Sequence, residues 1–203
     1  MKLIYKGRFK GKDQLPKGVL PPNAVKFREP NSLVMVNVIG ILFLIPVLLL
    51  VILAVVLSEL FHGAVDFNFS LTYIFITGAL VLLSFFPHEL LHAVCFGKGA
   101  EVELYVSPLA FFVTSTVPIT KMRFIFLSLL PNLIFGVIPL LLWIALPYFE
   151  SFSDVLFLFA VFSLCLGAGD YINVFNATLQ MPKGSMQQLS GINSYWFMPE
   201  NIS

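Results

Sequence analysis

Residues 80–96 read LVLLSFFPHELLHAVCF, an apolar stretch that carries the pattern H-E-x-x-H at His88, Glu89 and His92. On an α-helix, side chains at positions i and i+4 lie on one face, so both imidazoles can reach one metal ion. Glu89 can then act as the general base on a metal-bound water. Two imidazoles and a carboxylate between apolar flanks are costly unless something pairs them. The stretch therefore predicts a Zn²⁺ site for hydrolysis inside a membrane; two unrelated histidines at a polar helix end are the alternative.

The composition is that of a membrane protein. Of the 203 residues, 58% are hydrophobic and 11% are charged, which excludes an ordinary soluble domain. Four apolar segments are long enough to cross a bilayer, at roughly residues 33–57, 69–96, 122–147 and 152–181. We expect an all-α multi-pass membrane protein with about four transmembrane helices.

The basic residues are concentrated before the first apolar segment. Eight of the 12 Lys and Arg residues lie within positions 1–32. We interpret 1–32 as a basic cytoplasmic segment that touches anionic lipid, 33–181 as the membrane metalloprotease domain, and 182–203 as a cytoplasmic tail. Nucleic acid is excluded as a partner for so short a tethered segment, and no cleavable signal peptide is expected.

Charges in the loops indicate the orientation. By the positive-inside rule both termini are cytoplasmic, and the motif then lies toward the cytoplasmic side of the bilayer. His62 falls in an external loop, where we expect no role. Cys95 and Cys165 lie in apolar segments and are expected to be small buried residues, although a ligand role for Cys95 stays open.

A catalytic zinc usually has three protein ligands, and no histidine follows His92. Asp170 is the carboxylate that we favour, because it lies inside an apolar segment where a carboxylate needs a partner. Small residues at 167–169 allow its helix to approach another closely. The alternative is that Asp170 only hydrogen-bonds to Asn132 or to a hydroxyl. The other carboxylates after the motif are expected in loops or the tail as solvated charges: Glu101, Glu103, Glu150, Asp154 and Glu200.

Together, the motif on one membrane helix and Asp170 on a later one resemble the site of site-2-type intramembrane metalloproteases. Leu130-Pro131-Asn132 is loosely similar to the Gly-Pro-x-x-Asn element of that class. It lacks the glycine, and its asparagine is closer to the proline. Gly169-Asp170 reverses the order of the aspartate-glycine step of that class.

A closer resemblance is to the small bacterial membrane proteins grouped as "putative zincin peptidase". It is carried by Gly169, Asp170 and Asn173, by the exit Pro182-Lys183-Gly184 and by the small size, and it covers roughly residues 70–190. The resemblance implies a bacterial cell membrane, zinc ligands at His88, His92 and Asp170, and Glu89 as the base. Asn132 is the candidate for stabilising the transition state, with hydrogen bonding between helices as the alternative. Asn173, one turn after Asp170, is a candidate for orienting it.

Residues 99–120 predict a β-hairpin associated with the membrane between the second and third helices. Residues 101–106 alternate, Ser107-Pro108 marks a turn, and 111–117 are rich in β-branched and aromatic residues. The hairpin could align an extended peptide by strand addition, or it could simply plug the helix bundle.

The function that fits these features is a zinc-dependent intramembrane endopeptidase that acts on a transmembrane protein or peptide. The alternative is a non-proteolytic zinc-binding membrane protein, such as a chaperone, an adaptor or a transporter. A membrane zinc hydrolase for lipid or prenylated substrates is a third class. Retention of Glu89 argues against a site that has lost activity, because a purely structural site does not need a base.

Overall fold

The structure is a computed structural model that describes residues 1–203 except 30–32, 64–66, 68, 108–110 and 200–203, and the side chains of 33–37. It divides into two compact units. The sheet unit comprises Met1–Pro30, Phe86–Leu129 and Asn173–Ser203. The helical unit comprises Asn31–Phe85 and Leu130–Ile172. Each unit is therefore built from segments that are distant in the sequence.

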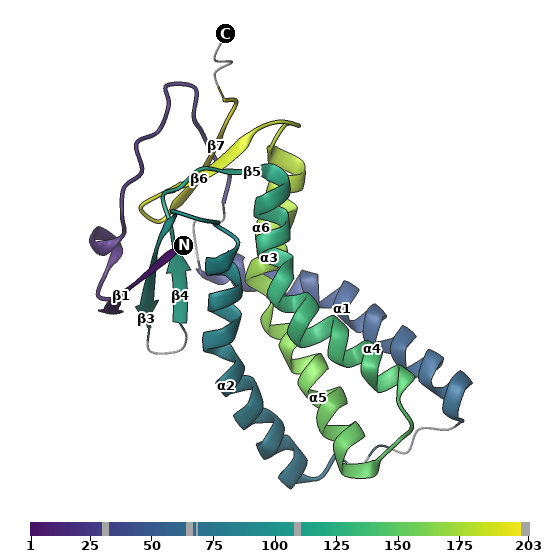
Figure 1. The fold of residues 1–203 in the computed structure, drawn as a ribbon. Coiled ribbons are helices and arrows are strands. Elements are labelled where there is room, and N and C mark those ends of the chain that lie inside the picture. The colour runs from purple at the N-terminus through teal and green to yellow at the C-terminus, as the bar shows by residue number, and fades with distance from the viewer. Residues whose placement is uncertain (30–32, 64–66, 68, 108–110, 200–203) are drawn as a thin grey trace. The chain divides into compact units, whose positions relative to one another are not determined.

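Within the described residues, three helical segments are long and apolar enough to cross a membrane: Val38–His62, Leu71–Val94 and Lys121–Ala145. The expected fourth span is a pair of helices bent by 48°, and it counts as a span only if both parts cross together. The helices, labelled in Figure 1, are α1 (Leu33–His62), α2 (Leu71–Val94), α3 (Lys121–Asn132), α4 (Ile138–Ala145), α5 (Glu150–Leu166) and α6 (Ala168–Gln180).

The helical unit is held together by a core of aromatic and aliphatic side chains from α1, α4 and α5. Trp143 of α4 lies 4.6 Å from Phe157 of α5 between ring centroids, and Phe67 stacks on Trp143. Between α3 and α4 the helix widens into the π-helix η2 (Leu133–Val137). A Cβ at Gly136 of η2 would lie 2.5 Å from Leu164 Cδ2, so glycine allows the close contact with α5.

Two residues expected in loops lie in helices of the helical unit. His62 ends α1, and its Nε2 lies 2.8 Å from the carbonyl oxygen of Ile144. Asp154 lies in α5 with no exposed surface, and the hydroxyl of Tyr148 donates to its Oδ1 at 3.2 Å. The expectation of a solvated Asp154 was therefore wrong, because the preceding turn supplies a hydrogen-bond donor that makes burial tolerable.

A three-stranded sheet of the sheet unit contains the expected hairpin. Its strands are β1 (Lys2–Arg8), β3 (Glu101–Val106) and β4 (Phe111–Thr114), in the order β1-β3-β4. β3 and β4 pair antiparallel, as the alternating sequence predicted, whereas β1 pairs parallel to β3. Within the described residues, β4 is thus an edge strand.

A second sheet joins the two ends of the chain. Its strands are β2 (Val25–Lys26), β5 (Ile119–Thr120), β6 (Met186–Ser190) and β7 (Asn193–Phe197), in the order β2-β7-β6-β5. The turn between β6 and β7 begins at Gly191, whose φ of 60° favours glycine. The expectation of an all-α protein with a single hairpin was wrong for both terminal segments, because β1 and β2 find their partners far along the chain.

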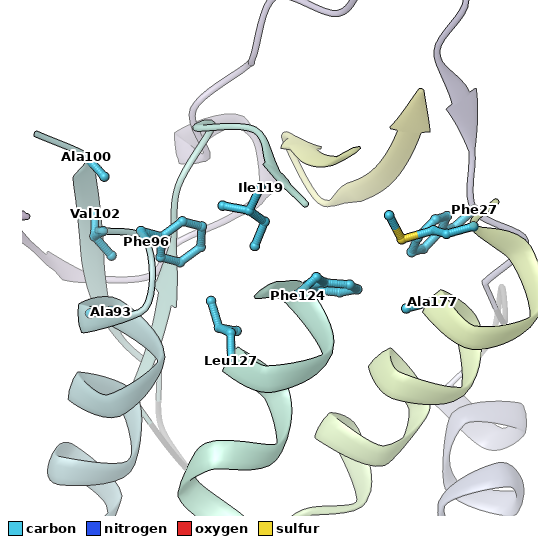
Figure 2. Packing of buried hydrophobic residues seen from close by; sticks show 10 residues of the cluster. Phe27, Ala93, Phe96, Ala100, Val102, Ile119, Phe124, Leu127 and Ala177 are labelled. Atoms are coloured by element: carbon cyan, nitrogen blue, oxygen red, sulfur yellow. The ribbon is translucent and has the colours of Figure 1, made fainter. Parts of the chain in front are cut away.

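The core of the sheet unit joins the end of α2 to α3, α6 and both sheets. Figure 2 shows Ala93 on α2, Phe124 and Leu127 on α3 and Ala177 on α6, with Ile119 nearby. Lys121 reinforces this core, because its Nζ donates to the carbonyl oxygens of Thr178 at 3.2 Å and Met181 at 2.6 Å. A cation at the C-terminus of α6 is favourable for the helix dipole.

Tyr105 fastens the N-terminal segment onto the first sheet. The buried hydroxyl of Tyr105 shares its one proton between Glu103 Oε2 at 2.7 Å and the carbonyl oxygen of Gln14 at 2.9 Å. Burial and the neighbouring carboxylate raise the pKa of Tyr105 to about 12. The ring of Phe112 stacks on it at 5.2 Å. Residues 1–15 are therefore part of the fold around β3 and β4.

Candidate metal centre

The H-E-x-x-H motif occupies the last two turns of α2. His88, Glu89 and His92 each offer a ligand atom, and these atoms lie within 4.8 Å of one another, close enough to hold one metal ion. The two imidazole centroids are 4.9 Å apart. The helical spacing thus produces the juxtaposition that the sequence predicted.

His92 is oriented by a backbone carbonyl of α3. Its Nδ1 lies 2.9 Å from the carbonyl oxygen of Leu127, and the residue is 8% exposed. A carbonyl accepts only, so Nδ1 carries the proton and Nε2 is the nitrogen that can bind a metal. This arrangement is the one that metal-binding histidines usually show, and together with the donor set it fits zinc.

Glu89 is in contact with the edge strand β4. Its Oε2 accepts a hydrogen bond of 3.0 Å from the backbone N–H of Val113. The N–H groups of an edge strand alternate between its partner and the open side, so those of Phe112 and Thr114 point toward β3. The motif therefore faces the side of β4 that is turned away from β3. The ring of Phe86, just before the motif, packs edge-to-face with Phe111 of β4 at 5.9 Å.

Asp170 belongs to a second polar cluster, in the helical unit. It is 9% exposed and lies in the first turn of α6. The Nδ2 of Asn132 donates to Asp170 Oδ2 at 2.8 Å, and the hydroxyl of Tyr171 donates to Asn132 Oδ1 at 3.2 Å. The hydrogen bond weighed as an alternative for Asp170 is thus present, and the metal-ligand role of Asp170 stays a prediction.

The remaining candidates have simpler surroundings. Asn173 is half-buried in α6, and its part in orienting Asp170 stays a prediction. Cys95 is half-buried just after α2 and packs against the core of the sheet unit. Glu101 and Glu103 lie on β3, where they pair with Lys2 at 2.7 Å and Lys6 at 2.9 Å.

Two further carboxylates were expected as solvated charges. Glu150 begins α5, and Glu200 lies outside the described residues.

Three groups that the sequence did not single out contact the candidate residues. Two are backbone groups, the carbonyl of Leu127 and the N–H of Val113, for which a sequence carries no direct signal. The third is Tyr171, which also donates to the carbonyl oxygen of Leu164 at 2.9 Å. Its position beside a buried aspartate is a signal that could have been used.

A His-Glu-His group of this kind, at the end of a helix that can cross a membrane, defines a candidate membrane metalloprotein. The chain belongs to the family described as "putative zincin peptidase", whose model matches residues 81–186. The match spans the motif, the hairpin and Asp170, and the family description implies zinc. No curated protein and no solved structure matches the chain.

Proposed function

We propose that the protein is a zinc-dependent intramembrane endopeptidase, related to the site-2-type metalloproteases. The observation that carries the proposal is the His88-Glu89-His92 group, with His92 oriented by Leu127, on a helix suited to a membrane. Membership of the family described as "putative zincin peptidase" supports the same reaction.

His88 and His92 would hold the metal, and Asp170 is the third ligand that we propose. When bound, zinc supplies Lewis-acid polarisation of the scissile carbonyl and lowers the pKa of a water molecule toward neutrality. The carboxylate of Glu89 accepts the proton of the attacking water and later returns it to the leaving amine. Glu89 is half-buried, so its carboxylate can meet water from one side while the other side contacts β4.

The open edge of β4 supports a way of holding the substrate. A peptide that pairs with this edge would run past Glu89, because the N–H of Val113 points toward that carboxylate. Strand pairing requires an extended backbone. The proposed substrate is therefore a transmembrane or membrane-adjacent segment that unwinds locally, with water entering from the cytoplasmic side.

The test uses the purified full chain in detergent and in proteoliposomes. Zinc content is measured, and cleavage is followed with a single-span reporter protein and with labelled casein. Glu89→Gln should keep stoichiometric zinc and lose turnover by at least about a hundredfold, the usual scale for removing a general base. Glu59→Gln, an exposed carboxylate on α1, is the matched control and should behave as wild type.

Each outcome decides between functions. Turnover that survives Glu89→Gln would show that the mechanism is wrong. A zinc-loaded protein that cleaves neither probe would favour a non-proteolytic zinc-binding role. Cleavage of casein alone would place the peptidase activity outside the membrane.

A further inference from the structure

The helical unit holds Asp170 through a chain of hydrogen bonds that begins at Tyr171. We propose that Gly167, Asn132 and Tyr171 are positioning residues that fix the carboxylate of Asp170 as a metal ligand. The proposal rests on the zinc role of Asp170 in the proposed function. It assigns Asn132 to ligand orientation instead of transition-state stabilisation.

The hydrogen-bond directions within this chain agree with one another. Asn132 is 4% exposed and donates through Nδ2 to Asp170 Oδ2 at 2.8 Å. Its Oδ1 accepts from the hydroxyl of Tyr171 at 3.2 Å, which assigns the two ends of the amide. The single proton of this hydroxyl is shared with the carbonyl oxygen of Leu164, which lies 2.9 Å away, so the start of the chain is tied to the last turn of α5. The hydrogen bond from Asn132 to the Asp170 carboxylate is strong, because it is charge-assisted and buried.

Gly167 provides the space in which the amide of Asn132 lies. A Cβ at Gly167 would lie 1.8 Å from Asn132 Oδ1 and 2.6 Å from Cγ, so any other residue must displace that amide. Gly169, two residues later, differs sharply, because a Cβ there would meet nothing within 4 Å. Of the two glycines beside Ala168, only Gly167 is therefore needed for the contact with Asn132.

The backbone is irregular on both sides of the contact between Asn132 and Asp170. α5 and α6 meet at Gly167 with a bend of 48°, and Asp170 follows in the first turn of α6. The N-terminus of a helix stabilises negative charge. On the other side, Asn132 is followed immediately by η2, a π-helix of the kind often found at functional sites.

Zinc affinity and the visible spectrum of the Co²⁺-substituted full chain test the proposal. Affinity is measured by chelator competition in detergent. Gly167→Ala should weaken zinc binding by about 10–100-fold, the range for loss of a group that orients a ligand. Tyr171→Phe should weaken it by about fivefold, because one neutral hydrogen bond is removed. Both should shift the Co²⁺ absorption bands, which report the ligand geometry.

Each variant has a matched control. Gly169→Ala adds the same methyl group in open space, and Tyr148→Phe removes a hydroxyl from the other buried carboxylate, Asp154. Both should keep wild-type zinc affinity and an unchanged Co²⁺ spectrum. The thermal unfolding of the metal-free variants shows whether Gly167→Ala acts only by loss of folding.

Failure of the ligand assignment and failure of the positioning role give different results. If Asp170→Ala keeps wild-type zinc affinity, the ligand assignment in the proposed function fails. If Asp170→Ala loses zinc while Tyr171→Phe keeps both affinity and spectrum, the positioning role is overturned, even where Gly167→Ala fails to fold.

Discussion

Replacing Val113 with proline tests whether the open edge of β4 takes part in the reaction. Proline removes one backbone N–H and changes no residue of the motif. That N–H donates to Glu89 Oε2 at 3.0 Å, on the side of β4 away from β3, where an edge strand tolerates proline. The β3–β4 pairing should therefore survive the change.

The expected loss follows from one hydrogen bond to an ionised group. Such a bond contributes about 1.5–3 kcal/mol when desolvated, and both partners here are only half-buried, so we take about 1–2 kcal/mol. At about 1.4 kcal/mol per factor of ten, kcat/KM for the single-span reporter should fall by about 5–30-fold. Zinc content should not change, because His88 and His92 are untouched.

The assay is the rate of cleavage of the reporter in proteoliposomes, measured well below the unfolding temperature of each variant. Val113→Ala is the control, because it keeps the N–H and trims only the side chain; its kcat/KM should stay near wild type. A Val113→Pro protein that folds normally and cleaves at the wild-type rate would refute the role of this edge. Equal losses in both variants would assign the effect to packing.

Three other changes probe the fold. Lys121→Met should lower the unfolding free energy by about 1–2 kcal/mol, because two hydrogen bonds to the end of α6 are lost. Lys183→Met, at an exposed position, is the control and should leave the unfolding free energy unchanged. Equal melting curves for the two variants would contradict the stabilising role of Lys121. Gly136→Ala should destabilise the helical unit by about 1–3 kcal/mol through overpacking, whereas Gly78→Ala, with open space around it, should not; thermal unfolding decides. The pKa of Tyr105 rises to about 12 from 10.0, so the folded state holds this proton more tightly and stability should fall as pH rises through that interval. The Tyr105→Phe variant should lose less stability than the wild type as the pH rises, as measured by melting curves. An identical alkaline loss in the variant and the wild type would show that Tyr105 is not its cause.

The sequence was sufficient for features that depend on short spacings. The i, i+4 relation of His88 and His92 became one ligand group, and the alternation at 101–106 became β3 of an antiparallel hairpin. Both follow from the geometry of a single element. Asp170 also drew attention correctly as a buried carboxylate with a partner, because burying one without a partner is costly.

Features that depend on distant parts of the chain could not be predicted in this way. β1 is short and basic, and its parallel partner β3 lies beyond two long helices. The hairpin of β6 and β7 does carry a local signal, Gly191 between two alternating stretches, which the interpretation as a tail overlooked. The contacts of the motif with Leu127 and Val113 use backbone groups, so the identity of those residues gives no indication of them.

The order in which the sheet unit is synthesised has a consequence for the cell. Its segments are residues 1–30, 86–129 and 173–203, and β2 pairs with β7, which the ribosome makes long after β2. At about 5–20 residues per second, β2 waits roughly ten to thirty seconds for this partner. A newly made chain therefore contains its H-E-x-x-H helix long before the second sheet is complete. A premature stop near residue 190 would harm the framework of the motif even though every proposed zinc ligand had been made.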